Sequence, residues 1–255
     1  MGIRGLGSRI LDAVSVDRPL WMLAASVAVT LALYAIGLAL RALPGVASRY
    51  IEAFPAAFAI VFAVSIYGRP LRPSPRRPLR VYAVSMAVAY ATLAALAAPP
   101  GFYTALASPS TVTQFVGEVE SFRSSYTTVP AMALAIFEHN LKIDAISYVP
   151  VAGAALFGFS LMETSSLVWA VGATSLWGGN RFWYAYVLSV LLAPATFTEF
   201  SSYALAVAGG HELYSALIRS DRGGLWLSLT LMVASVALLY ASAVLEAWLI
   251  ISVGA

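Results

Sequence analysis

Long apolar runs separated by short polar segments dominate the first half of this 255-residue chain. The runs 20–40, 54–68 and 81–98 contain no charged residue. The first two end at an arginine, and the third ends at a Pro-Pro-Gly triplet, which terminates a helix. A helix needs about 20 mostly apolar residues to cross roughly 30 Å of hydrocarbon. The pattern therefore predicts three membrane-spanning helices in this half.

The second half, from Pro130 onward, has apolar runs that ionisable residues interrupt. The runs are 143–161, 163–177, 182–194, 199–218 and 225–253. The ionisable residues inside or beside them are Glu138, His139, Lys142, Asp144, Glu163, Arg181, Glu199 and Glu246. Because irregular backbone exposed to lipid is too costly, short runs indicate re-entrant or kinked helices buried among others. The predicted fold class is an all-α, polytopic transmembrane helix bundle of six to seven spans, with short, broken or re-entrant helices in its second half.

The segment 69–80, between the second and third runs, sets the expected orientation. It contains five arginines and no acidic residue. Short loops rich in Lys and Arg lie on the cytoplasmic side of a membrane. We therefore expect a multi-pass protein of the cytoplasmic membrane, with this loop and the N-terminus in the cytoplasm and residues 99–128 outside. Nucleic-acid binding is the alternative reading of the arginines, but the loop has no interleaved aromatic residues and topology accounts for its charge.

The outside segment contains one further predicted element. Apolar residues from Ser110 to Ser124 recur at roughly helical spacing. This predicts a helix that lies at the membrane surface or caps the bundle, and a partner-binding helix is the sharper alternative. The chain is then divided into an N-terminal three-span region, 1–128, and a C-terminal membrane region, 129–255.

Composition agrees with this picture and limits the chemistry. Hydrophobic residues make up 60% of the chain and charged residues 11%, whereas a soluble domain is about a quarter charged. With no Cys and two His, the chain has no disulfide, thiolate nucleophile, Cys-based zinc site or multi-histidine metal cage. No phosphate-binding loop, nucleophile elbow or dinucleotide fingerprint is present. We therefore predict no catalytic residue, metal or cofactor. The scarcity of Asn, Gln and Cys is typical of a thermophile, with an archaeal-like composition, and GC-rich coding bias is the alternative.

An ionisable residue inside a span is a functional-site candidate, because burying its charge is costly. We predict a buried polar cluster of Asn140, Lys142, Glu199 and Glu246 that locks the second-half helices together. Lys142, the single lysine, would pair with Glu138, Glu199 or Glu246, and the alternative is that it extends to the membrane surface. The secondary candidates are Glu138, His139, Asp144, Glu163 and His211. Pro194 would break a helix and let Glu199 begin a new one, and Gly209 with Gly210 would permit close helix packing.

These segments, in this order, resemble the stage II sporulation protein M family of integral membrane proteins over roughly 130–251. Its aromatic, Asn and basic positions at the head of a span match Phe137, Asn140 and Lys142. Its Pro, followed five residues later by a Glu that opens an Ala- and Gly-rich helix, matches Pro194 and Glu199. The chain departs from the family where it has Ala195-Thr196 in place of His-Gly, and Met162-Glu163-Thr164 near an expected Asn-Gly. The family's last span has a small-residue run and a Glu, as Ala241 to Glu246 does here.

The resemblance implies a membrane scaffold, because bacterial members of the family localise partner proteins during envelope remodelling. The leading hypothesis is a non-enzymatic protein that positions other membrane or envelope proteins in the lipid bilayer. A permease-like transporter subunit of the ABC-exporter type is the alternative, and it would need a separate ATPase because no ATP-binding motif is present. An intramembrane hydrolase is third. Homo-oligomerisation stays open, and no nucleic-acid partner is expected.

Overall fold

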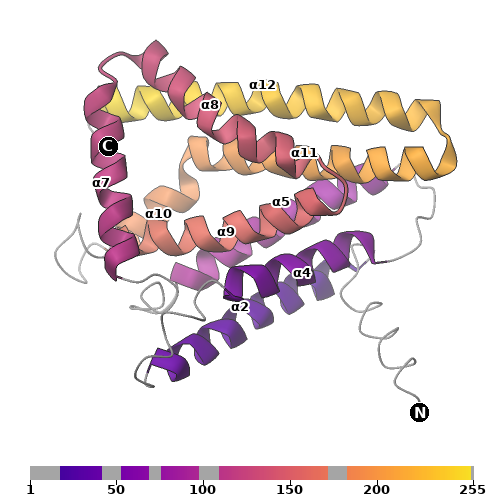
Figure 1. Ribbon diagram of the computed structural model, residues 1–255, viewed down its shortest axis with the longest axis horizontal. Coiled ribbons are helices and arrows are strands. Elements are labelled where there is room, and N and C mark those ends of the chain that lie inside the picture. The colour runs from indigo at the N-terminus through magenta and orange to yellow at the C-terminus, as the bar shows by residue number, and fades with distance from the viewer. Residues whose placement is uncertain (1–17, 42–52, 69–75, 98–108, 172–182, 254–255) are drawn as a thin grey trace.

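The computed structural model describes residues 18–41, 53–68, 76–97, 109–171 and 183–253, and within these ranges every element is a helix. The helices in Figure 1 are α2 (Pro19–Arg41), α4 (Ala53–Tyr67), α5 (Arg77–Ala97), α7 (Pro109–Ser125), α8 (Val129–Ser147), α9 (Ala152–Val171), α10 (Trp183–Leu192), α11 (Pro194–Arg219) and α12 (Arg222–Val253). The all-α class predicted from the apolar runs is confirmed. Part of the arginine-rich loop, 69–75, and the first 17 residues lie outside the described ranges, as does Arg181.

The two longest helices, α11 and α12, form an antiparallel hairpin at one side of the molecule (Figure 1). Helix α8 packs against both of them, α5 packs against α11, and α4 packs against α9. One apolar core draws on both halves of the chain, and its largest members include Phe58, Phe62, Phe157 and Trp169. Among the described residues, the buried acidic side chains are Asp144 on α8 and Glu212 on α11.

The predicted span 143–161 is corrected, because two helices share it. Helix α8 ends at Ser147 and α9 begins at Ala152, with a turn at 148–151 between them. Pro150 and the left-handed backbone of Val151, at φ 65°, make up this turn. A proline cannot donate the hydrogen bond that a continuous helix needs. The break was thus encoded by Pro150, inside a run whose apolarity is otherwise unbroken.

Two helices are long and apolar enough to cross a membrane by length and composition, at Arg77–Ala97 and Arg222–Ser252. Shorter apolar helices lie at Pro19–Ala32 and Pro55–Tyr67. Helix α8 carries three charged residues, and α10 has ten residues. Two such helices give weak evidence of membrane association, and they do not confirm the count of six to seven spans.

The helix predicted at Ser110–Ser124 is present as α7, one residue longer at each end. Its last turn carries Phe122, whose ring centroid lies 5.0 Å from that of Tyr126. Both rings pack against a second apolar cluster formed by Met132, Ala133, Ile136, Ala243 and Ala247 of α8 and α12. Helix α7 runs across the ends of its neighbours in Figure 1, so it caps this end of the bundle.

Candidate functional site

Asp144 of α8 is the most deeply buried acidic side chain among the described residues, with 1% of its surface exposed. The Ser235 hydroxyl of α12 lies 2.7 Å from its Oδ1 and 2.6 Å from its Oδ2. A hydroxyl donates one proton, so a single donor serves both carboxylate oxygens. This contact joins α8 to α12 through polar groups in an apolar interior.

Two further carboxyl groups lie on the neighbouring helices. The Tyr203 hydroxyl donates to Glu199 Oε1 at 3.0 Å, one turn away on α11. Tyr203 also interacts electrostatically with Asp144 and with Glu246 of α12, and Glu246 interacts with Glu199. Tyr203 therefore contacts Glu199 directly and lies within electrostatic range of one acidic group on each of α8 and α12. We call Asp144, Glu199, Tyr203, Ser235 and Glu246 the acid cluster.

Within the described ranges, no Lys or Arg forms an ion pair with any carboxylate of this cluster. Lys142 is exposed on the outer face of α8, which corrects the prediction that it joins the buried cluster. The reason is geometric: residues two apart on a helix point to different faces, and Asp144 faces inward. Asn140 is half-buried one turn before Asp144 on the same face. Glu199 and Glu246 are half-buried, and neither forms an ion pair with Lys142.

The proline break is present, but Glu199 does not begin the helix. Helix α11 starts at Pro194, with Ala193 in an extended conformation before it. Pro is favoured at the first helical position because it lacks the N–H that would be unpaired there. Glu199 lies in the second turn, and the helix dipole acts mainly on the first. Its hydrogen bond from Tyr203 is therefore the local interaction that holds it.

Gly209 and Gly210 lie where the turn after α8 meets α11. A Cβ on Gly210 would collide with the Tyr148 carbonyl oxygen, and one on Gly209 would lie 2.8 Å from Cε2 of that tyrosine. The Tyr148 and Ser228 hydroxyls form a hydrogen bond, and Ser228 also donates to the Gly209 carbonyl at 2.8 Å. The glycine pair therefore has a packing role, which brings the end of α8 close to α11 and α12.

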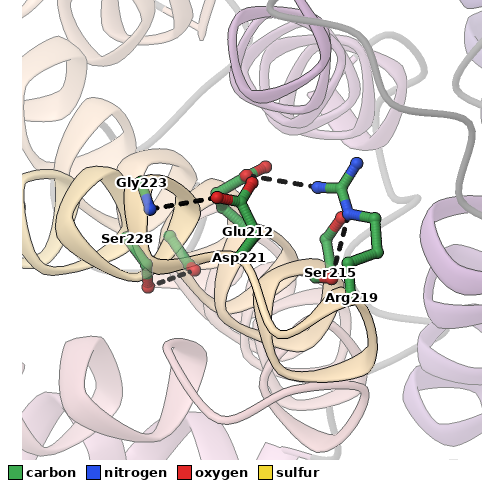
Figure 2. A network of polar contacts seen from close by, with 7 residues as sticks. Glu212, Ser215, Arg219, Asp221, Gly223 and Ser228 are labelled. Atoms are coloured by element: carbon green, nitrogen blue, oxygen red, sulfur yellow. Dashed lines mark hydrogen bonds and ion pairs between the residues drawn. The ribbon is translucent and has the colours of Figure 1, made fainter.

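The corner between α11 and α12 carries a separate polar network (Figure 2). Arg219 Nη2 lies 3.6 Å from Glu212 Oε1, and its Nε donates to the Ser215 carbonyl at 3.2 Å. Asp221, just before α12, accepts a hydrogen bond from the Gly223 N–H at 3.0 Å. An acidic side chain at this position satisfies a free N–H of the first turn. The network fixes the corner, and none of its residues belongs to the acid cluster.

His211 lies close to this corner and is fully buried, at 0% exposure. Its ring centroid is 5.4 Å from that of Tyr67, which is in turn 5.5 Å from Tyr214. Neither ring nitrogen has a hydrogen-bond partner among the described residues, and the buried Arg77 lies within electrostatic range. The end of α4, the start of α5 and the last third of α11 therefore meet.

The remaining candidates do not enter the acid cluster. Glu138 and His139 are exposed on α8, and Glu163 is exposed on α9. In the part of the chain that the structure describes, no three His, Asp or Glu side chains are grouped so that they could hold a metal ion. An open groove follows one face of α7. It is lined by Gln114, Gly117, Glu118, Ser121, Phe122, Ser125 and Tyr126.

Sequence reasoning missed Tyr203, Ser235 and Tyr148. Tyr203 stands four residues after Glu199 on a predicted helix, a spacing that brings two side chains together, so a signal existed. No sequence signal marked Ser235 as a contact to another helix. Serines on apolar helices commonly donate to a carbonyl of their own helix, as Ser26 does to the Met22 carbonyl at 2.9 Å.

Comparison of the chain with protein-family models, with curated proteins and with solved structures gave no match. The resemblance to the stage II sporulation protein M family therefore stays a prediction.

Proposed function

We propose that this chain is a permease-like protein of the cytoplasmic membrane and that the acid cluster carries protons. The observation that carries the proposal is a pair of polar contacts inside the bundle, Asp144 with Ser235 and Glu199 with Tyr203. Glu246 lies within electrostatic range of Glu199, and no Lys or Arg of the described ranges is paired to the three carboxyl groups. Intramembrane acidic residues mark ion pathways and proton relays. A structural lock would instead hold each carboxyl group through Asn140, Lys142 or backbone N–H groups, and Lys142 is exposed.

The positions of the helix ends support a membrane placement. Tyr67 at the end of α4, Arg77 at the start of α5 and His211 in the last third of α11 lie together. The turn after α8 also contacts α11, at Gly210. Successive helices that alternate in direction across a bilayer would bring these ends to one side. We propose seven crossings, by α2, α4, α5, α8, α9, α11 and α12, with the short α10 re-entrant and the arginine-rich loop in the cytoplasm.

The extent of the cluster supports a pathway rather than a single contact. Ser235 and Glu246 are eleven residues apart on α12, or about 16 Å along the helix. This is about half of a 30 Å hydrocarbon core. Carboxyl and hydroxyl groups both donate and accept hydrogen bonds when protonated. In the proposed path, a proton held at Glu199 or Glu246 passes Tyr203 and reaches Asp144.

Ion flux into liposomes tests the proposal. The purified full chain would be reconstituted with a trapped pH-sensitive dye, and a potassium diffusion potential would drive proton entry. Parallel vesicles would contain a sodium- or potassium-sensitive dye. We expect proton flux above that of empty vesicles, and we expect Asp144→Asn and Glu199→Gln each to lower it at least about tenfold, a barrier change of about 1.4 kcal/mol.

Glu120→Gln is the matched control, because Glu120 is exposed on α7, away from the cluster. Its flux should equal that of the unchanged chain. Vesicles that leak no more than empty ones, or an Asp144→Asn chain with unchanged flux, would overturn the proposal and leave the cluster a structural element.

A scaffold is the second candidate, and the groove along α7 favours it. This groove combines acidic, hydroxyl and aromatic side chains on a helix that caps the bundle. A photo-cross-linker attached at Ser121→Cys would capture a partner protein in native membranes, and Glu118→Lys should abolish that capture. The same cross-linker at Ser252→Cys, exposed on α12, is the control. Equal capture from both positions would remove the scaffold hypothesis.

A further inference from the structure

Helix α8 presents ionisable side chains on its outer face as well as on its inner one. Glu138, His139 and Lys142 are all exposed. Two contacts between α8 and α12 fix the position of these groups along α12. The ring centroids of Phe137 and Tyr240 are 5.4 Å apart, and Asp144 accepts a hydrogen bond from Ser235. The outer groups therefore lie beside the middle third of α12, away from both helix ends.

These outer groups have no partner in the described part of the chain. No ion pair joins Glu138 to Lys142, although they are one turn apart. A Lys or Asp facing lipid at the centre of a span costs about 2.5–3.5 kcal/mol. Lys142 is five residues, about 8 Å, from the end of α8 and can extend toward the surface. Glu138 is nine residues, about 14 Å, from either end, so its carboxylate has no such route.

We propose that this face of α8 is covered by the same face of α8 in a second copy of the chain. A two-fold axis along the membrane normal places the two helices side by side at equal depth. Glu138 of one copy then lies one turn, about 6 Å, in depth from Lys142 of the other, and the pairing occurs twice. Like residues lie at equal depth in this arrangement, so the dimer depends on each Glu138 side chain turning along the helix axis toward the Lys142 of the other copy.

The residues around the charges permit such close packing. Ala131, Ala135 and Ala145 lie on the same face as Glu138 and Lys142, at helical spacings of three, four and seven. Small side chains at helix contacts inside a membrane let two backbones approach each other. This dimer depends on α8 crossing the membrane, as proposed above, but not on the movement of ions, so either proposal can fail without the other.

Cysteine cross-linking in native membranes tests the dimer, because the chain has no Cys of its own. Ala135→Cys and Ala145→Cys should form disulfide-linked dimers on mild oxidation. Ala133→Cys, on the buried face of α8, and Ala237→Cys, exposed on α12, are the matched controls. Both controls should stay monomeric.

Charge swaps then identify the pairing. In the Ala145→Cys background, Glu138→Lys and Lys142→Glu each bring like charges together and should lower the cross-linked fraction at least about tenfold under dilution in lipid. The double swap restores opposite charges and should recover it. Cross-linking at Ala145→Cys no stronger than at Ala237→Cys, capture of a different protein instead of a second copy, or a double swap that fails to recover would each overturn the dimer.

Discussion

The ionisable residues on the two faces of α8 differ in burial and in their hydrogen-bond and ion-pair partners. On the inner face Asp144 is 1% exposed and both its carboxylate oxygens accept from Ser235. On the outer face Glu138 and Lys142 are exposed and lack an ion-pair partner within the described ranges. The two faces belong to one helix of 19 residues. Burial by the chain's own helices, rather than residue type, therefore distinguishes them.

This difference shows that one polar segment of an apolar helix can place ionisable residues on both its inner and its outer surface. In the sequence, Glu138 to Asp144 forms one continuous polar segment. On a helix, the spacing of its residues divides them between an inner and an outer face. The inner face acts within the molecule, where we propose that the acid cluster carries protons. The outer face acts between molecules, where we propose that it forms a dimer.

The largest predicted loss of stability comes from disturbing the close contact between the turn after α8 and α11. Gly210→Ala places a Cβ against the Tyr148 carbonyl, so the backbone itself must move. Such overpacking should lower the free energy of unfolding by about 3 kcal/mol. Thermal unfolding in detergent measures it. Gly117→Ala on α7, which has no atom within 4 Å of an added Cβ, should leave the melting temperature unchanged or raise it, and equal losses in both would contradict the packing role.

A smaller loss of stability is predicted for substitutions on the inner face of α8, and almost none for those on its outer face. Asp144→Ala removes a buried carboxyl and leaves the Ser235 hydroxyl without its acceptor, which should cost about 2 kcal/mol of unfolding free energy. Lys142→Ala removes an exposed group and should change the detergent-solubilised monomer by less than about 0.5 kcal/mol. Chemical or thermal unfolding of both variants measures the contrast. Equal destabilisation by the two changes would show that the faces do not differ.

The smallest effect concerns the turn that ends α8. Val151 is β-branched, exposed and held at φ 65°, a conformation that glycine adopts without strain. Val151→Gly should therefore raise the free energy of unfolding by about 1 kcal/mol. Val149→Gly, exposed in the same turn without a positive φ, should lower it instead. A melting temperature that falls in both variants would refute the strain at this turn.

The sequence allowed the helices to be predicted better than the site. The uncharged runs gave α2, α4 and α5 directly, because their apolar lengths approach a bilayer width. The turn at Pro150 was hidden within a longer apolar run. Helical spacing predicts that Lys142 and Asp144 lie on different faces of the helix. Because both faces carry a charged residue, the spacing does not predict which face turns inward. That depends on how α8 crosses α12, through contacts such as Asp144 with Ser235 that join residues 91 positions apart.

Water access to the acid cluster tests the central claim most directly. A pathway must admit water beside Asp144, whereas a structural lock is dry. Ser235→Cys, in a chain without native Cys, would be treated in native membranes with a small, charged thiol reagent. Ser26→Cys is the control, since Ser26 is a buried serine of α2 that bonds its own helix. We predict that the cysteine at position 235 reacts at least about tenfold faster than the one at position 26, a difference of about 1.4 kcal/mol in barrier. Equal, negligible labelling of both would contradict the pathway.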